Sequence, residues 1–584
     1  MCVRMGVSRR CVAHRNEFGP HWAHSANPQH HMVRDTENPG ERKRAMKVFR
    51  KAAVIAFTAV AATAVADVRL VKMAEGENWW GVANYFGPKM PFTDRTDLTI
   101  DLMKNGFYNQ YASLLLSDRG RLIWCDRQCR FDFKGGVIKV TSPEGVPIEV
   151  TSSGTTLREA FRDASKRHFP PSGKTPDLTF ISAPQYNTWI ELTYNQNEKD
   201  ILAYAQSMLD NGMPPGVFMI DDTWQTNYGV WEFEPRRFPD PKGMCDKLRA
   251  MGFKIVLWMC PWVSMDSQPY RTMCDGQDPF KVEKQPTGGF LTLDGKDPAP
   301  VKWWNGKSAL LDFTHPNGRR WFKAQLDRLV KTYGVEGFKL DGGSLHYYTQ
   351  GLKSHEDIPS GDQANGYLAY ALQYPVCEYR HAWKNGGQPI VQRLHDKKHR
   401  WDEVRALIPS MIAGGLLGHS FICPDMIGGG EWRTFVPGAP FDPELFVRSA
   451  QVHALCGMMQ FSASPWRVLE AEKQQIVRNL VKMRQEKFAV KFVELAKECG
   501  RTGEPMIRNL EYEFPGNGYA AVTDQFMMGA FLMVAPQMEK GAAERSVLIP
   551  PGKWKADDGS YVEGPRKIVV KTPLERLPYF EIVR

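Results

Sequence analysis

From Thr188 onward, short apolar segments alternate with longer amphipathic segments, and this alternation constrains the fold more than any other feature of the sequence. The short segments are predicted to be strands and the longer ones helices, which indicates repeated β/α units around a parallel sheet. Roughly eight units fall within about 280 residues, as expected for a (β/α)8 barrel. No glycine-rich phosphate loop follows the first strand, so an open dinucleotide-binding sheet fits the pattern less well.

The predicted elements can be placed on the sequence. The strands are 189–193, 216–220, 254–258, 310–312, 337–341, 390–393 and 420–423. The helices are 199–209, 244–251, 319–332 and 402–416.

Both flanks of this region have an all-β character. Residues 67–187 contain short alternating runs separated by turn residues, and the pattern returns after a helical stretch at 470–499. We therefore predict an α/β protein with a TIM barrel at residues 188–500. An N-terminal β-sandwich at 67–187 and C-terminal β-sandwich structure at 501–584 would flank it.

The first 66 residues have the features of an export signal. A basic segment, Lys47 to Lys51, precedes an apolar run, and Ala64-Val65-Ala66 forms a small-residue cleavage site. We expect a signal peptide at 46–66 and an exported protein, periplasmic or extracellular. Residues 1–45 lack hydrophobic periodicity and are interpreted as a mis-assigned start or a disordered extension. The alternative is a membrane anchor, but an apolar run of about 15 residues is short for a bilayer, so we expect no stable membrane insertion.

The charge distribution argues against a nucleic-acid partner. The 584-residue chain has 75 Lys and Arg and 65 Asp and Glu, a net charge of +10. The first 66 residues carry +7 of this, and the remaining +3 is too small for the basic footprint of a nucleic-acid binder. Nothing in the sequence defines an oligomeric state.

The cysteine pattern provides no metal site. Nine of the 11 cysteines follow the leader, an odd number that cannot all pair. Cys125 and Cys129 could form a local disulfide in an oxidising compartment, whereas Cys260, Cys423 and Cys456 lie in apolar runs and are expected to be buried thiols. Neither a CxxC pair nor an HExxH motif occurs after the leader, so we expect no metal and no cofactor.

Acidic residues recur directly after predicted strands. Asp221 and Asp222 follow the strand 216–220, Asp341 ends the strand 337–341, and Asp425 follows the strand 420–423. A single Asp in such a place is more often a turn former or a helix cap. Because the carboxyl ends of barrel strands form the catalytic face, the recurrence indicates an active site.

The two-residue period of a strand adds a lysine to this set. Lys339 and Asp341 point to the same side of their strand, away from Phe338 and Leu340, and would face the barrel interior. A lysine beside Asp341 would keep its carboxylate ionised, as a nucleophile requires. The alternative is a structural ion pair.

Tryptophans are dense around these positions. Indole faces suit the axial hydrogens of sugar rings, although each tryptophan could equally be a core residue. The residues are Trp224, Trp231, Trp258, Trp262, Trp303, Trp304 and Trp401.

Several segments resemble glycoside hydrolase family 31, in the order and spacing of that family. They are 218–224 (FMIDDTW), 231–244, 252–258 (GFKIVLW), 312–316 (DFTHP), 338–343 (FKLDGG) and 423–429 (CPDMIGG). The resemblance extends from about Thr188 to the C-terminus. Segments 301–306, 393–396, 407–410 and 459–466 are similar to a branch of the family that contains bacterial α-galactosidases.

The resemblance implies roles for individual residues. Asp341 would be the nucleophile and Asp396 the general acid/base, which must then have a raised pKa. Arg380, sixteen residues before Asp396, would bind the sugar. The other expected substrate-binding residues are Asp221, Asp222, Trp258, Trp304, Lys339 and Asp425.

Two departures from the family pattern concern the substrate. His395-Asp396 stands where the family often has Gly-Asp, and Ser344 stands where it often has Glu. We predict a secreted, retaining exo-α-glycosidase that acts on a carbohydrate substrate and is most similar to an α-galactosidase. The alternatives are an α-glucosidase or α-xylosidase, or a barrel that binds carbohydrate without catalysis.

Overall fold

The computed structural model describes residues 66–104, 108–278, 281–348 and 351–583. The expected extension at 1–45 and residues 46–65 of the expected signal peptide lie outside the described residues. Within the described ranges, no helix has the length and apolar character needed to span a bilayer.

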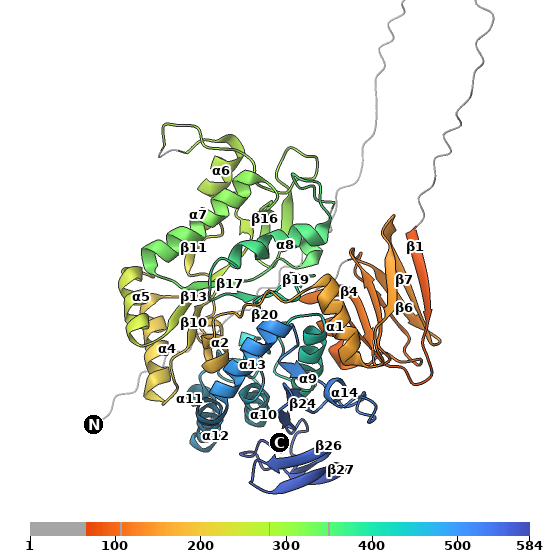
Figure 1. Ribbon diagram of the computed structural model, residues 1–584. Coiled ribbons are helices and arrows are strands. Elements are labelled where there is room, and N and C mark those ends of the chain that lie inside the picture. Colours follow the sequence, from red (N-terminus) through yellow and green to blue (C-terminus); the bar gives the residue numbers. More distant parts are fainter. Residues whose placement is uncertain (1–65, 105–107, 279–280, 349–350, 584) are drawn as a thin grey trace, which may run out of the picture. The chain divides into compact units, whose positions relative to one another are not determined.

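A parallel sheet of eight strands lies at the centre of the described chain (Figure 1), in the spatial order β21-β20-β18-β17-β13-β10-β9-β22. The strands are β9 (Gln185–Asn187), β10 (Val217–Ile220), β13 (Lys254–Met259), β17 (Gly337–Leu340), β18 (Glu378–Tyr379), β20 (Val391–Arg393), β21 (Phe421–Cys423) and β22 (Gln460–Phe461). A parallel bridge between Met426, three residues after β21, and Gln460 of β22 connects the two edges of the sheet. The sheet is therefore a nearly closed barrel, and the predicted TIM barrel is confirmed.

Amphipathic helices connect the barrel strands. They include α4 (Glu198–Asp210), α5 (Pro241–Ala250), α7 (Pro316–Tyr333), α8 (Ser360–Ala371), α9 (Trp401–Leu416) and α10 (Pro443–Ala454). Local sequence fixes their starts: the Asp240 side chain accepts a hydrogen bond from the Gly243 N–H at the beginning of α5, where proline occupies the first helical position.

The first barrel strand differs from the prediction. Residues 189–193 were expected to be a strand, but Trp189–Leu192 form the short helix α3, and the strand is β9, four residues earlier. The Asn187 side chain accepts a hydrogen bond from the Trp189 N–H, 2.8 Å away, which turns the chain directly after β9. This local bond outweighs the strand propensity of Trp189 and Ile190.

Antiparallel sheets precede the barrel, as predicted. One contains β1 (Ala66–Lys72), β7 (Val137–Glu144), β6 (Arg130–Lys134) and β3 (Leu98–Asp101). The other contains β2 (Trp79–Ala83), β4 (Gln110–Ser117), β5 (Arg121–Cys125), β8 (Ile148–Ser152) and, parallel to β4, β19 (Ala382–Trp383) from the barrel segment. Helix α1 (Leu157–His168) interrupts the region expected to be all β, and it begins with a capping box formed by Thr156 and Glu159.

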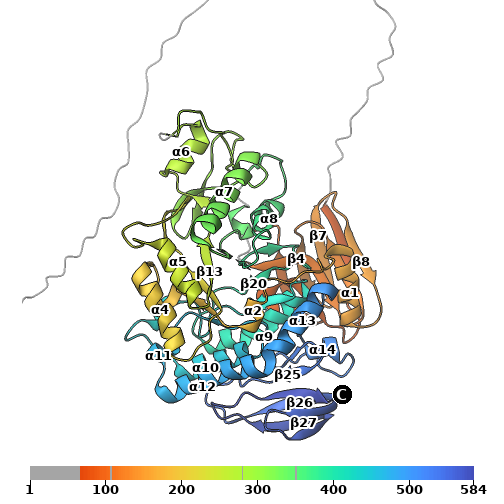
Figure 2. The same ribbon diagram turned by 60° about the vertical axis from the view of Figure 1, so that its left-hand side comes forward.

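The C-terminal β region is also antiparallel, as predicted, and forms one six-stranded sheet. Its order is β23 (Ile507–Arg508), β24 (Phe526–Met528), β25 (Leu532–Val534), β28 (Tyr579–Val583), β26 (Glu544–Ala556) and β27 (Tyr561–Lys571). Helices α12 (Ala471–Met483) and α13 (Ala489–Thr502) precede it in the chain, and Figure 2 shows β26 and β27 below these helices.

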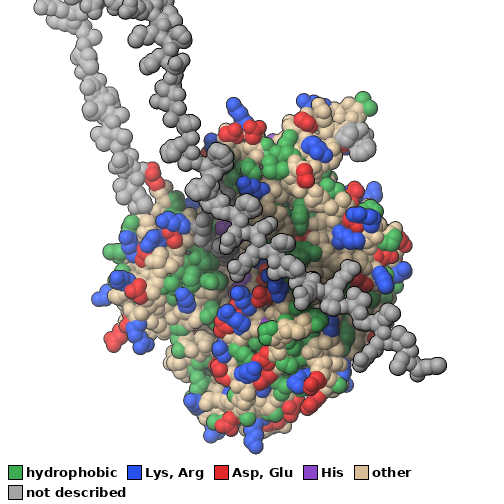
Figure 3. Space-filling model, turned by 180° about the vertical axis from the view of Figure 1, so that it is seen from behind, with side chains coloured by type: hydrophobic (Ala, Val, Ile, Leu, Met, Phe, Trp, Pro, Cys, Tyr) green, Lys and Arg blue, Asp and Glu red, His purple; other side chains and the backbone are tan. Residues whose placement is uncertain are grey.

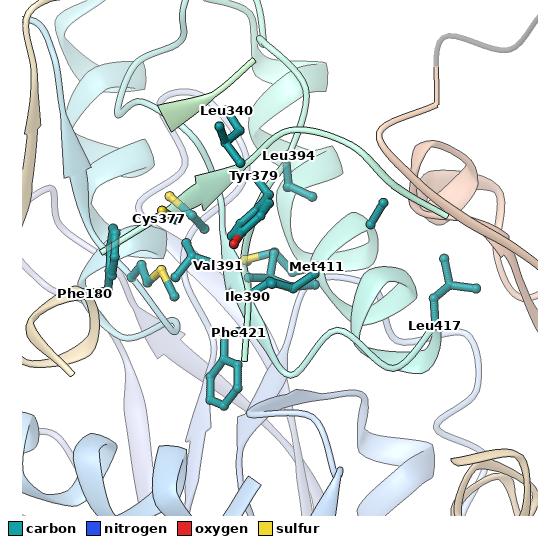
Figure 4. Packing of buried hydrophobic residues seen from close by; sticks show 14 of the residues in the cluster. Phe180, Leu340, Cys377, Tyr379, Ile390, Val391, Leu394, Met411, Leu417 and Phe421 are labelled. Carbon is teal, nitrogen blue, oxygen red and sulfur yellow. The ribbon is translucent and has the colours of Figure 1, made fainter. Parts of the chain in front are cut away.

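The core of the barrel fixes the strands that carry the acidic residues. Tyr379 of β18, Val391 of β20 and Phe421 of β21 are buried, and they pack with Met411 of α9 (Figure 4). Burial of these apolar side chains holds the strand backbones in place. The residues that follow each strand therefore project from a rigid base.

The cysteines answer an open question and confirm a prediction. Cys125 and Cys129, which could have formed a local disulfide, are buried free thiols. Cys260, Cys423 and Cys456 are buried thiols, as expected.

On the face shown in Figure 3, Lys and Arg side chains are interspersed with Asp and Glu and do not gather into one basic area.

Candidate active site

A cavity of about 410 Å³ opens at the carboxyl ends of the barrel strands. It is lined by Trp189, Tyr194, Asp221, Asp222, Trp258, Trp304, Lys339, Asp341, Arg380, Arg393, Asp396, Lys397, Lys398, Met426, Gly430 and Glu431. Eight of the nine predicted site residues are in this set; the missing one is Asp425. A larger cleft of about 1010 Å³ lies beside helix α6 (Gln268–Asp275) and contains none of the predicted site residues.

Asp341 follows β17 and is held by four donors. Its Oδ1 accepts hydrogen bonds from the Gly342 N–H at 2.8 Å, Arg380 Nη1 at 2.9 Å and Arg393 Nη2 at 3.2 Å. Its Oδ2 accepts one from Trp258 Nε1 at 3.0 Å. Burial works to raise the pKa of Asp341, but the positive charges of Arg380 and Arg393 outweigh it and hold the pKa well below the usual range. Asp341 is therefore an ionised, oriented carboxylate.

Asp396 shares both guanidinium groups with Asp341. Arg393 Nη1 donates to its Oδ1 at 2.7 Å, and Arg380 Nη2 lies 3.1 Å from its Oδ2. Unlike Asp341, the Asp396 side chain is 44% exposed. The predicted raised pKa of Asp396 is wrong for this arrangement. Partial desolvation in the cavity works to raise the pKa, but the positive charges of Arg380 and Arg393 outweigh it and hold the pKa below the ordinary value.

Lys339 corrects a second prediction. Lys339 Nζ lies 2.9 Å from Asp221 Oδ2 and pairs with that carboxylate. It does not pair directly with Asp341, although Lys339 and Asp341 are both buried in the barrel interior. The reason is the sheet order: β17 neighbours β13 and β13 neighbours β10, so Lys339 can reach across to the residue that follows β10. The ionised state of Asp341 depends chiefly on the two arginines.

Asp222 lies beside Asp221 and is equally buried. Tyr228 Oη donates to its Oδ2 at 3.1 Å, and the Thr223 N–H donates to its Oδ1 at 2.7 Å. Burial, reinforced by the negative charge of Asp221, raises the pKa of Asp222 to about 7. This carboxyl group can therefore change its protonation state near neutral pH.

We expect the raised pKa of Asp222 to make stability depend on pH. Between pH 4 and pH 7, roughly, the folded protein keeps a proton that the unfolded chain has released, so stability falls as pH rises through this window. In Asp222→Asn the side chain is neutral at every pH, so this fall in stability does not occur. Its melting temperature relative to the parent protein should rise between pH 5 and pH 8 in thermal melts. Asp246→Asn, at an exposed carboxyl on α5, is the control and should show no such rise; the same flat result for Asp222→Asn would contradict the prediction.

Trp304 occupies the turn of a hairpin between β15 (Pro300–Trp303) and β16 (Gly306–Leu310). Its side chain is 44% exposed and packs edge-on against Trp262, with ring centroids 5.3 Å apart. Next to it, Asn305 Nδ2 donates to Tyr228 Oη, which in turn donates to Asp222. A chain of hydrogen bonds thus connects the Trp304 turn to the acidic base of the cavity.

Asp425 does not line the cavity, which corrects its predicted role as a direct substrate ligand. It is fully buried, and its φ of 67° turns the chain after β21. Its oxygens lie 3.5 Å from Arg393 Nη1 and 3.8 Å from Lys397 Nζ. Asp425 can therefore influence a bound ligand only through these cations.

Arg393 lines the cavity but is not among the predicted site residues. It is the last residue of β20 and is almost completely buried, and it binds both Asp341 and Asp396. The same rule that found the acidic residues, position at the carboxyl end of a strand, could have found it. Trp189, Tyr194, Lys397, Met426 and Glu431 lie in loops or short helices and carry no comparable signal.

This arrangement brings together two carboxyl groups with different access to solvent. Asp341 is buried and oriented by four donors, which suits a nucleophile, and Asp396 faces the cavity, where a proton can exchange with water. No group of three or more His, Cys, Asp or Glu in the described ranges is placed to hold a metal ion.

Comparison with known proteins connects this fold and site to one class of enzymes. Residues 184–487 match the glycosyl hydrolases family 31 TIM-barrel domain, and residues 503–581 match the family's C-terminal domain. The chain belongs to glycoside hydrolase family 31.

Individual relatives agree with this assignment. The chain is 31% identical over 441 residues to myogenesis-regulating glycosidase of Mus musculus, covering 73% of this chain and 60% of that protein. It is 25% identical over 510 residues to an alpha-xylosidase of Emericella nidulans, covering 80% of this chain and 60% of that one. The chain thus spans about 60% of the length of both relatives.

A solved structure shares the fold. The family 31 dextranase of Flavobacterium johnsoniae, complexed with glucose, superposes with a TM-score of 0.75 at 18% identity, covering 89% of this chain and 66% of the dextranase.

Proposed function

We propose that this chain is an exported, retaining exo-α-glycosidase that prefers α-galactosides. The observation that carries the proposal is the pair of carboxyl groups, Asp341 and Asp396, held by the same two guanidinium groups. A retaining glycosidase needs two such groups about 5–5.5 Å apart, one ionised and one able to carry a proton.

The proposed mechanism is a double displacement. Asp341 attacks the anomeric carbon while Asp396 gives its proton to the departing glycosidic oxygen, which forms a covalent glycosyl-enzyme and releases the aglycone. Asp396 then takes a proton from water, which attacks the anomeric carbon and frees both the sugar and Asp341. Arg380 and Trp258 orient Asp341 throughout.

The preference for galactose rests on the groups around the ring. Galactose differs from glucose by an axial 4-hydroxyl, which needs an acceptor on one side of the ring and a wall on the other. Asp221 or Asp222 can accept hydrogen bonds from the 4- and 6-hydroxyls, and the partly exposed indole of Trp304 can form the wall.

Two of the alternatives are glycosidases of the same reaction class, and the third is a protein without catalytic activity. The similarity to an alpha-xylosidase and to a dextranase supports an α-xylosidase or α-glucosidase. A carbohydrate-binding protein without catalysis is the third possibility. A panel of p-nitrophenyl α-glycosides separates the three: we expect the galactoside to be cleaved fastest, cleavage of only the glucoside or xyloside refutes the galactose preference, and binding without cleavage refutes the enzyme.

Trp304→Ala tests the wall. Discrimination by apolar shape is worth about 1–3 kcal/mol, so we expect galactoside kcat/KM to fall roughly ten- to two-hundred-fold. The control is Trp321→Ala on α7, which removes a partly buried indole outside the cavity and should leave kcat/KM nearly unchanged. An unchanged galactoside preference in a Trp304→Ala variant with a normal thermal melt would show that specificity lies elsewhere.

Export is proposed from the leader at residues 46–66. We expect N-terminal sequencing of the exported protein to find Asp67 as the first residue. Retention of Met1 or Met46 would refute this processing.

A further inference from the structure

Asp425 is a fully buried carboxylate that lacks hydrogen-bond donors. Neither of its oxygens accepts a hydrogen bond from any described residue. The two cations beside it are at ion-pair distance: Arg393 Nη1 at 3.5 Å and Lys397 Nζ at 3.8 Å. Burying a charge without hydrogen bonds costs free energy, so a contribution to the stability of the fold does not explain why Asp425 is placed here.

One nitrogen of Arg393 lies between two carboxylates. Its Nη1 donates to Asp396 at 2.7 Å and faces Asp425 at 3.5 Å. A movement of roughly half an ångström would bring it to normal hydrogen-bond distance from Asp425. Lys397 Nζ is farther from Asp425, at 3.8 Å, and donates to the Pro424 carbonyl at 2.7 Å.

The proposed reaction requires such a movement. Asp396 must be protonated to release the aglycone, but in the present arrangement Arg380 and Arg393 both hold it as a carboxylate. A protonated Asp396 attracts a guanidinium group far less. Arg393 Nη1 also donates to the Leu394 carbonyl at 3.2 Å, so one of its two N–H groups keeps its partner. The N–H group that leaves Asp396 would need another acceptor inside the barrel, and Asp425, 3.5 Å away, accepts no hydrogen bond from any described residue.

We propose that Arg393 exchanges partners during catalysis: it binds Asp396 while that residue is a carboxylate and binds Asp425 while Asp396 is protonated. The inference rests on the proposed function. The proton on Asp396 comes from water at its exposed side and goes to the glycosidic oxygen; Arg393 keeps its charge throughout.

The charged groups around Arg393 favour an exchange of its partner between Asp396 and Asp425. The groups that face Asp396 and Arg393 are Lys339 and Asp341 at β17, Glu378 and Arg380 at β18, and Lys397 and Asp425 in the loops after β20 and β21. Asp341 stays bound to Arg393 Nη2 in both states, and Glu378 faces the Nε atom at 3.8 Å, so neither competes for Nη1. Asp425 thus acts as a positioning residue for the acid/base.

A crystal structure of Asp396→Asn without substrate tests the exchange directly. Asparagine is a neutral isostere of the protonated acid, and residue 396 is exposed, so folding should be unaffected. We expect Arg393 Nη1 to move within hydrogen-bond distance of Asp425. If Nη1 remains on residue 396 and the 3.5 Å separation from Asp425 persists, the proposal is wrong.

Leaving-group kinetics provide a second test. In Asp425→Asn, Arg393 should remain on Asp396 and hinder its protonation. We expect kcat/KM for a phenyl α-glycoside to fall at least tenfold more than for the matching glycosyl fluoride, whose departure needs little acid help, and the basic limb of the pH profile to move to lower pH. Glu378→Gln is the control: it removes another buried carboxylate near Arg393, but both substrates should lose the same factor.

The outcomes separate this inference from the proposed function. Equal losses on the two substrates in Asp425→Asn would refute the exchange while leaving an active glycosidase. If the unaltered chain cleaves no α-glycoside, the proposed function fails, but the Asp396→Asn structure still reports the partner of Arg393. If Asp425→Asn does not fold, that structure alone decides.

Discussion

Asp341→Asn should abolish cleavage of every α-glycoside, with kcat/KM below one thousandth of that of the parent, because no carboxylate remains to attack the anomeric carbon. The loss should be the same for phenyl glycosides and glycosyl fluorides, since the nucleophile is needed whatever the leaving group. Initial rates on matched substrates measure it.

Asp396→Asn should fail differently. General acid catalysis contributes roughly 10²–10⁴-fold, and this contribution matters least when the leaving group departs unaided. We expect a large loss on phenyl glycosides, a small loss on glycosyl fluorides, and faster turnover when azide replaces water as the second nucleophile.

Equal losses of activity on phenyl glycosides and glycosyl fluorides in Asp396→Asn would contradict these roles. If Asp396→Asn is as inactive on the fluoride as on the phenyl glycoside, and azide restores nothing, Asp396 is not the acid/base. Product analysis adds a check: azide should attack the β-linked glycosyl-enzyme from the face opposite Asp341, so the glycosyl azide should have the retained α configuration.

Lys339→Met should destabilise the barrel by about 3–5 kcal/mol. The Lys339–Asp221 pair is almost completely buried, with side-chain exposures of 3% and 6%, and removal of one partner leaves an uncompensated charge. Denaturant unfolding at pH 7, with thermal melts beside it, measures the loss.

Two variants test the cause. Lys254→Met breaks the Lys254–Asp177 pair, whose side chains are 37% and 18% exposed, and should cost no more than about 1 kcal/mol. The double variant Lys339→Met, Asp221→Asn should recover part of the stability, because it also removes the unpaired charge. If the double variant is no more stable than Lys339→Met alone, the loss comes from packing.

Much of this site follows from local sequence patterns. The alternation of apolar and amphipathic segments predicts the barrel, because strand and helix periods are properties of neighbouring residues. The rule that barrel chemistry lies at the carboxyl ends of strands then selects Asp221, Asp222, Asp341 and Asp425. The first three line the cavity, whereas Asp425 is buried outside its lining. Asp396 follows its strand by three residues and was found only through the resemblance to a family.

The sequence by itself determined the class of fold, the family and the positions of the acidic residues along the chain. Only the tertiary structure decided which cation binds which acid. Lys339 pairs with Asp221, 118 residues away, and Arg393 binds Asp341, 52 residues away. The burial of Asp425 behind the cavity depends equally on the turn after β21 and on the barrel around it. Such pairings depend on strand order and on the direction of each side chain in a closed barrel, and neither is encoded in the residues next to the charged group.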